Sequence, residues 1–156
     1  MGKKNHWLMK SEENVYSIDD LHQDGTTYWD GIRNYEARNI MRDRMKVGDL
    51  VLYYHSNASP SGVVGVARVV REAYPDPTQF DPKSPYHDEK ATKDEPRWWL
   101  VDVEFVEKFP RVVPLSEIKE HPDLQDMVLV KRARLSVQPV EKREFEIVRR
   151  LGQAKG

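Results

Sequence analysis

The most strand-like part of the chain reads Leu50-Val51-Leu52-Tyr53-Tyr54 and, after a turn, Val63-Val64-Gly65-Val66-Ala67-Arg68-Val69-Val70. The first run is almost continuously apolar, so we expect it to be covered on both faces. The two runs are joined by a stretch rich in Asn, Ser, Pro and Gly, which predicts a β-hairpin with a long loop. Gly65, in the middle of the second run, indicates a β-bulge or the close approach of another backbone.

Shorter elements precede this hairpin. His6–Lys10 is typical of a strand, and a helix is predicted over residues 17–23 because Ser17 and Asp20 have the spacing of a capping box. A second helix is expected to begin after Asn34, which serves as its N-cap and is followed by apolar residues that recur on one face.

The second half of the chain adds one long strand and several short elements. Arg97–Val106 has a period of two that places Trp99 on the apolar face, in the core, and Trp98 on the opposite face. We also predict a helical turn at 115–119, short strands at 129–130 and 134–137, and a final helix over 141–151. Unequal strands wrapped by short helices favour an α+β fold, a small barrel of mixed strands, formed by one domain over residues 1–156 with its core from about 5 to 151.

Residues 71–96 contain five prolines and no regular pattern. Loops longer than about 12–15 residues in a compact domain are usually functional lids or disordered segments. The aromatic residues Tyr74, Phe80 and Tyr86 favour packing, so we expect a lid.

Composition narrows the classes of function. The chain has 156 residues, a net charge of -1 and no cysteine, and it shows neither a signal-peptide pattern nor a long apolar run. We therefore expect an intracellular protein, cytoplasmic or, in a eukaryote, nuclear. A protein that grips long duplexes through many phosphates is usually strongly basic, so any nucleic acid is expected to be held by a local patch and a pocket.

The usual catalytic motifs are missing. There is no GxGxxG, no GxxxxGK[ST] and no GxSxG, and the five histidines are scattered, so we expect no cofactor and no metal site. Asp30, His55 and Asp102 are candidates for acid–base chemistry, but none has a visible partner in the sequence. We therefore expect a protein that is not an enzyme.

Several blocks of the chain resemble the EVE domain in the order that the family has them. They are Trp7–Glu12, Tyr16–Leu21, Trp29–Asn39, Tyr53–Asn57, Gly62–Ala67, Ala73–Asp76, Arg97–Val103, Met127–Val130 and Arg134–Val137. EVE domains are similar to YTH, ASCH and PUA modules, and their eukaryotic relatives form the thymocyte nuclear protein family. The resemblance implies a PUA-like pseudo-β-barrel with a pocket for a modified base in DNA or RNA. Two departures are Glu13, where a proline is common, and His87 with Glu89, which replace a typical tyrosine and proline.

Trp29 matches the tryptophan that forms one wall of the base cage in YTH domains, although it could instead plug the end of the barrel. Stacking a base on an aromatic ring contributes about 1–3 kcal/mol. Phe80, Tyr86 and Trp98 are candidates for the second wall, and Ser56 with Asn57 for contacts to the base edge. Asn34 joins the predicted pocket or acts only as a helix cap.

Arg33, Arg38 and Arg42 cluster near the start of one helix, where free N–H groups also favour anions. Together with Lys10 and Ser11 they are the predicted contacts to phosphate, unless they form only a solvated basic face. The sequence thus leads to a non-catalytic reader of methylated cytosine or adenine in nucleic acid. The alternatives are an enzyme or accessory factor of nucleic-acid modification, and a pocket for a small metabolite or a protein partner.

Overall fold

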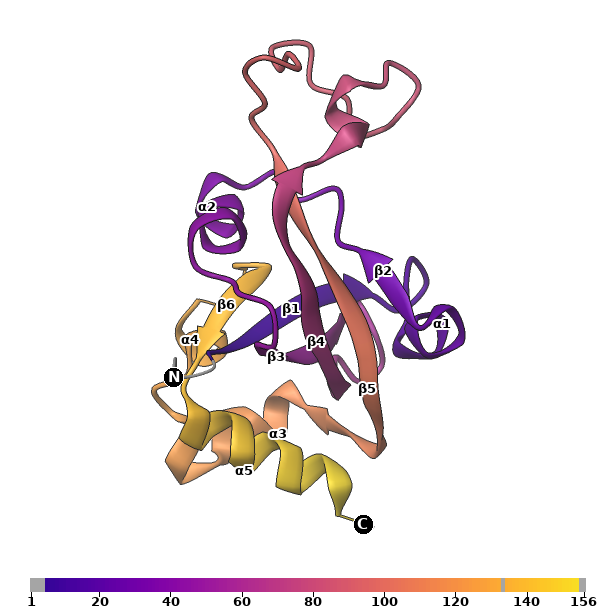
Figure 1. Ribbon diagram of the computed structural model, residues 1–156. Helices are drawn as coiled ribbons and strands as arrows, with labels where there is room; N and C mark the ends of the chain where they lie inside the picture. The colour runs from indigo at the N-terminus through magenta and orange to yellow at the C-terminus, as the bar shows by residue number, and fades with distance from the viewer. Residues whose placement is uncertain (1–4, 133, 155–156) are drawn as a thin grey trace.

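The computed structural model describes residues 5–132 and 134–154, and one mixed sheet of six strands organises them. The strands are β1 (His6–Glu12), β2 (Thr26–Tyr28), β3 (Leu50–Ser56), β4 (Gly62–Pro75), β5 (Trp99–Pro114) and β6 (Val137–Val140). Their order is β2-β5-β4-β3-β1-β6. The pair β1–β3 is parallel and the other pairs are antiparallel. Figure 1 shows β4 and β5 as two long neighbouring strands that lead to the segment between them.

The predicted hairpin is confirmed as β3 and β4. Residues along β3 are buried on both faces, since Leu52 belongs to one hydrophobic cluster and Tyr53 to another. The register shifts beside Gly65, where an added Cβ atom would lie 2.3 Å from the carbonyl oxygen of Glu107. Gly65 therefore serves both predicted purposes, since it permits an irregular register and a close backbone approach.

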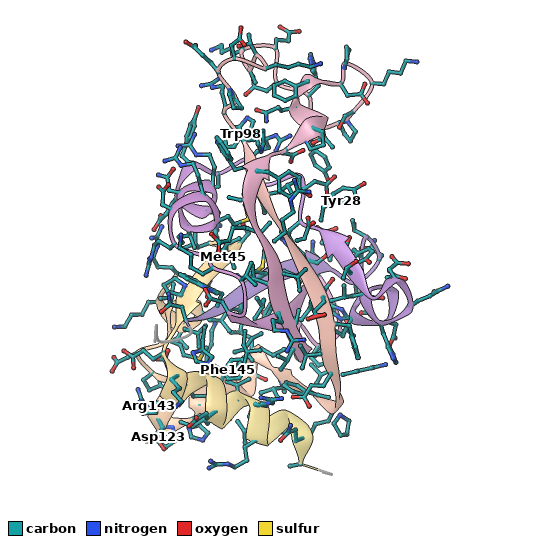
Figure 2. The ribbon with its side chains drawn as sticks, viewed as in Figure 1. Tyr28, Met45, Trp98, Asp123, Arg143 and Phe145 are labelled. Atoms are coloured by element: carbon teal, nitrogen blue, oxygen red, sulfur yellow. The ribbon has the colours of Figure 1, made fainter. Side chains whose placement is uncertain are left out.

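Short helices cover the sheet. They are α1 (Ile18–Asp24), α2 (Tyr35–Asp43), α3 (Leu115–Glu120), α4 (Val128–Lys131) and α5 (Lys142–Gln153), with 3₁₀ turns at Pro77–Phe80 and Pro122–Leu124. The capping box of Ser17 with Asp20 and the Asn34 cap are both present, as predicted. Figure 1 shows α3 and α5 together below the long strands and α2 to their side. Met45 lies below α2 and Phe145 beside α5 (Figure 2), each in its own buried cluster.

Several predicted boundaries differ from the structure, and the strand predicted at 97–106 runs from Trp99 to Pro114 as β5. Residues 71–75 continue β4, because they pair with β5 up to Pro75, a strand end where no donated N–H is needed. The strand predicted at 129–130 is the helical turn α4, and the strand predicted at 134–137 begins only at Val137. Residue 133, which precedes that predicted strand, lies outside the described residues. The last helix continues through Gly152 and ends at Gln153. Gly152 packs on Phe109, whose ring leaves no room for a Cβ atom.

Residues 76–98, which we name the crown segment, are bonded closely to the ends of β4 and β5. Gln79 is fully buried, and its amide nitrogen donates to the carbonyl oxygens of Asp76 and Trp98, both at 2.8 Å. Its amide oxygen accepts from the backbone N–H groups of Arg97, at 2.9 Å, and Trp98, at 3.0 Å. The Gln79 side chain thus joins the two ends of the crown segment through four hydrogen bonds.

Among the described residues, no helix is both long and apolar enough to cross a membrane.

We predict that Gln79→Glu destabilises the protein by about 3–5 kcal/mol, because it turns a buried donor into a carboxylate that faces two carbonyl oxygens. Urea unfolding measures the change. The matched control is Gln125→Glu, since Gln125 also donates to two carbonyl oxygens, those of Lys119 and His121, but is exposed. Water solvates the new charge there, so the control loses about 1 kcal/mol or less. Equal losses in the two variants would contradict the clamping role of Gln79.

Candidate nucleic-acid interface

A cavity of about 780 Å³ opens between the start of the chain and the loop that follows β2. Its volume lies in the range of about 300–1,000 Å³ that is usual for ligand sites. The residues that line it are Lys10, Ser11, Glu12, Val15, Tyr16, Asp24, Thr26, Thr27, Tyr28, Trp29, Asp30, Gly31, Ile32 and Tyr86. All of them except Tyr86 lie between residues 10 and 32, so neighbouring parts of the sequence build most of the cavity.

Trp29 forms part of the cavity wall and part of the core. Its backbone N–H donates to the carbonyl oxygen of Val101 at 2.9 Å, which extends the β2–β5 pairing by one residue. The indole meets the ring of Tyr53 edge to face, with centroids 5.4 Å apart and planes at 82°. Only 7% of Trp29 is exposed, and the residue borders the cavity, so it belongs both to the core and to the cavity lining.

The loop after Trp29 is tied to the crown segment. Gly31 has a φ of +81°, and its N–H donates to the carboxylate of Asp76 at 2.9 Å. A Cβ atom at Gly31 would lie 2.7 Å from Cζ of Tyr86, so only glycine allows this tyrosine to reach the cavity. Tyr86 therefore forms the part of the wall that the crown segment supplies.

Arg33 fastens the same two parts of the chain. Its Nε donates to the Tyr86 carbonyl oxygen at 3.1 Å, and its Nη1 donates to the Ile32 carbonyl oxygen and to the Asp76 carboxylate at 2.9 and 3.2 Å. Its Nη2 donates to Thr78 Oγ1 and again to the Tyr86 carbonyl oxygen, at 3.1 and 2.6 Å. These bonds use all five N–H donors of the guanidinium. Arg33 is thus a structural link here and has no donor left for the predicted phosphate contact.

The other predicted phosphate contacts divide into two groups. Lys10 and Ser11 line the cavity. Arg38 lies outside it and donates to the Arg97 carbonyl oxygen at 2.9 Å, while its guanidinium lies 4.7 Å from the Tyr35 ring centroid. Arg42 is exposed and pairs with its neighbour Asp43 at 2.8 Å.

Trp98 and Phe80 do not line the cavity of Trp29. Trp98 is 6% exposed, donates from Nε1 to Asp88 at 2.7 Å and stacks on Tyr35 with centroids 4.9 Å apart. Figure 2 shows it on the other side of the β4–β5 pair from Tyr28. Trp99, predicted to lie in the core, is only half-buried, whereas Trp98 is buried although it lies off the predicted apolar face.

The predicted edge-reading residues also lie outside the cavity lining. Ser56 ends β3 opposite Glu12, and Asn57 follows with a φ of +50°. The Asn57 amide donates to the Glu12 carboxylate at 2.7 Å and thereby holds one cavity carboxylate in place. Asn34 takes its plainer predicted role, since its Oδ1 accepts from the N–H of Ala37 at 2.9 Å.

Of the three acid–base candidates, only Asp30 lines the cavity. His55 is buried, and its Nε2 accepts from the N–H of Ile18 at 3.1 Å, while burial lowers its pKa. Asp102 accepts from the hydroxyl of Tyr74 at 2.6 Å. Both side chains therefore have structural partners.

Sequence reasoning missed the rim of the cavity. Val15 and Tyr28 line it and are 64% and 56% exposed, which is uncommon for apolar side chains. Asp24 also lines it and accepts from the hydroxyl of Tyr16 at 2.7 Å, while burial, followed by this bond, raises the pKa of Tyr16 to about 12. The one available signal was the period of two in β2, which directs Tyr28 away from its buried neighbour Trp29.

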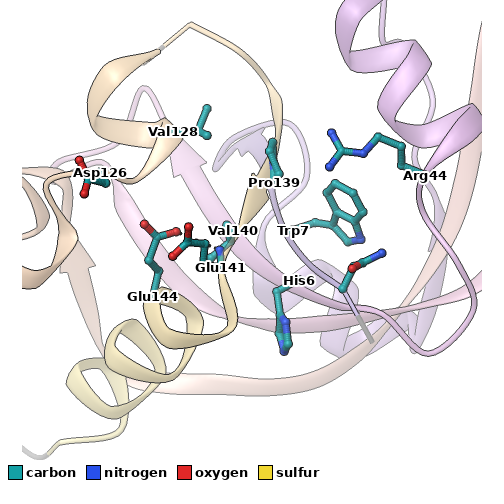
Figure 3. A pocket seen from close by; sticks show the side chains of 10 residues that line it. His6, Trp7, Arg44, Asp126, Val128, Pro139, Val140, Glu141 and Glu144 are labelled. Atoms are coloured by element: carbon teal, nitrogen blue, oxygen red, sulfur yellow. Dashed lines mark hydrogen bonds between the residues drawn. The ribbon is translucent and has the colours of Figure 1, made fainter. Parts of the chain in front are cut away.

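A second hollow, of about 340 Å³, lies between β1, β6 and the start of α5 (Figure 3). Trp7 borders it but is 1% exposed, with the Arg44 guanidinium 5.1 Å from its ring centroid and its Nε1 donating to Asp49 at 2.9 Å. The described part of the chain holds no group of three or more metal-ligating side chains, here or elsewhere. This hollow offers no open aromatic face, so we favour the cavity of Trp29 as the site.

Comparisons with known proteins identify the family and the fold. The family model described as the EVE domain matches residues 5–151. Thymocyte nuclear protein 1 of Gallus gallus is 44% identical over 96% of this chain and 69% of that protein. A hypothetical protein from Leishmania major has a solved structure with 49% identity and a TM-score of 0.93, over 97% of this chain and 96% of that one.

The human THYN1 protein, solved in complex with DNA that contains 5-methylcytosine, is 41% identical with a TM-score of 0.90, over 98% of this chain and 100% of that one. An ASCH protein from Zymomonas mobilis is 10% identical with a TM-score of 0.52, over 95% of this chain and 99% of that one, a likeness that shows the PUA-like fold alone. From its match over residues 5–151 and its similarity to these relatives, the chain belongs to the EVE domain family.

Proposed function

We propose that this protein binds DNA that carries a modified cytosine and holds that base, turned out of the helix, in the Trp29 cavity. The observation that carries the proposal is the indole of Trp29, which is fixed against Tyr53 and borders a cavity of about 780 Å³. A planar base gains most from an aromatic surface that is held in place before it arrives.

The charges of the lining favour a base over a phosphate as the occupant. Glu12, Asp24 and Asp30 supply three carboxyl groups, whereas Lys10 supplies the single basic side chain of the lining. Burial lowers the pKa of Lys10. An anionic phosphate would be repelled from such a cavity, so the base enters it and the backbone stays at the rim.

The choice of DNA and of cytosine is supported by the human THYN1 protein, which was solved with DNA containing 5-methylcytosine. That protein is 41% identical to this chain over nearly the full length of both. The net charge of -1 favours a mode in which one base and its neighbours supply the affinity rather than a long series of phosphates. DNA as the partner would place the protein with the genome, in the bacterial cytoplasm or the eukaryotic nucleus.

Binding without chemistry is part of the proposal. Of the groups suited to proton transfer, His55 and Asp102 are engaged in structural hydrogen bonds, and Asp30 lies in the cavity with no described nucleophile or base bonded to it. General acid–base or nucleophilic catalysis requires such groups within hydrogen-bond reach of one another.

We predict that Trp29→Ala lowers the affinity for a short duplex with one 5-methylcytosine by about 10- to 100-fold, which corresponds to the loss of about 1–3 kcal/mol of stacking. Fluorescence anisotropy measures the affinity. Trp29→Phe, which keeps an aromatic face, should lose less, and thermal unfolding checks that both variants fold. Equal affinity of the wild type and Trp29→Ala would overturn the proposed function.

We also predict that Tyr28→Ser weakens binding by about fivefold or more, because its exposed ring stands at the cavity mouth, where it can pack on the bases next to the flipped one. Tyr35→Ser is the matched control, since Tyr35 is 47% exposed but lies outside the cavity lining. Both variants are titrated with the same duplex. A larger loss for Tyr35→Ser would place the DNA on the α2 side of the molecule.

A further inference from the structure

Asp30 differs from the other carboxyl groups around the cavity. Glu12 accepts from Asn57, Asp24 accepts from Tyr16, and the buried Asp76 next to the loop accepts from Gly31. No other residue of the described chain donates to the Asp30 carboxyl, which is half-buried, borders the cavity and follows Trp29 directly. Its own backbone N–H interacts with it. A half-buried carboxyl that keeps further bonding capacity beside an aromatic wall is suited to read the edge of a stacked base.

We propose that Asp30 reads the flipped cytosine as a neutral carboxylic acid, donating its O–H to N3 and accepting a hydrogen bond from the N4 amino group. This inference rests on the proposed function. It implies that base binding by this protein takes up one proton from the solvent when Asp30 is ionised beforehand.

The chemistry of the base edge requires that proton. The Watson–Crick edge of cytosine presents one donor, the N4 amino group, and two acceptors, N3 and O2, with N3 next to the amino group. An ionised carboxylate is an acceptor only, so one of its oxygens would face the lone pair of N3, whereas a neutral carboxyl has one donor and one acceptor. Guanine presents two donors, N1–H and the N2 amino group, and is therefore suited to the ionised form. The protonation state of one side chain thus selects between the two bases.

The 5-methyl group lies on the other edge of the ring and is read separately. Burying this methyl group gains about as much free energy as burying one methylene, which corresponds to only about a fourfold preference for the methylated base. Asp30 accordingly favours a base with an amino donor beside a ring-nitrogen acceptor, as in cytosine and adenine, over guanine, and the 5-methyl group adds a modest preference for the methylated base.

The surroundings of Asp30 favour the neutral acid. Burial and then the charge of Asp76 raise the pKa of Asp30 above its ordinary value, while a hydrogen bond from its own backbone N–H and the Arg33 guanidinium oppose the shift. The other ionisable side chains of the lining are Lys10 and Glu12 on β1, Tyr16 and Asp24 beside and on α1, Tyr28 on β2 and Tyr86 on the crown segment. Because the folded pKa is raised, the neutral form is present at low pH and is lost as the pH rises through that pKa.

The test is Asp30→Asn, measured from mildly acidic to mildly alkaline pH with a duplex that carries 5-methylcytosine. The asparagine amide offers a donor and an acceptor without a proton. We expect the wild-type affinity to fall by up to about tenfold for each pH unit above the pKa of Asp30. The affinity of Asp30→Asn should stay nearly constant and exceed that of the wild type at the alkaline end. Asp30→Leu should bind at least about tenfold more weakly at the acidic end.

Asp24→Asn is the matched control, because it removes a second carboxylate of the same lining and should keep the wild-type pH dependence. Calorimetry in buffers of different ionisation enthalpy should show about one proton taken up by the wild type above the pKa and none by Asp30→Asn. Identical pH profiles for the wild type and Asp30→Asn, with Trp29→Ala still defective, would overturn the role of Asp30 and leave the proposed function intact. Full binding by Trp29→Ala would overturn both.

Discussion

The buried carboxylate of Asp76 is the interaction on which the arrangement of the cavity depends. It accepts hydrogen bonds from Gly31, Arg33 and the backbone of Thr78, so the loop after Trp29 and the crown segment share one anchor. A buried ionised group is tolerated only when it is paired and hydrogen-bonded, and loss of a partner from such a pair typically costs about 3–5 kcal/mol. The charge of Asp76, which holds this loop in place, also raises the pKa of Asp30. Asp76 therefore affects both the shape of the cavity and its electrostatics.

The sheet and the cavity depend on each other. β2 has only three residues, but its pairing with β5 continues through the Trp29 N–H and places the indole against Tyr53 of the central strand β3. Trp29 is therefore positioned by backbone hydrogen bonds as well as by its own packing. An aromatic wall of this kind loses little conformational entropy when a planar ligand stacks on it.

Much of the fold was predictable because local signals and tertiary packing agree. The β3–β4 hairpin, the capping box of Ser17 and the Asn34 cap were each specified by residues close in sequence. The strand predicted at 129–130 was wrong because a short apolar run satisfies a helical turn as well as a strand, and packing selects the turn.

The candidate site was less predictable, since its contacts join distant parts of the chain. Trp29 could be singled out from its polar neighbours and from the family resemblance, and the structure places it at a cavity. Four of the five Arg33 donors and the position of Trp98 depend on the crown segment, which lies more than 40 residues after the loop that it meets. No local pattern encodes such partners.

The two clamps at the base of the crown segment have an evolutionary consequence. Because Gln79 closes the ends and Asp76 anchors the loop, the residues from Glu89 to Glu95 bear on neither the sheet nor the cavity lining. Insertions and deletions in that stretch would change the outer contour while the cavity keeps its dimensions. Lineages could therefore diversify the outer surface of the crown segment without rebuilding the cavity.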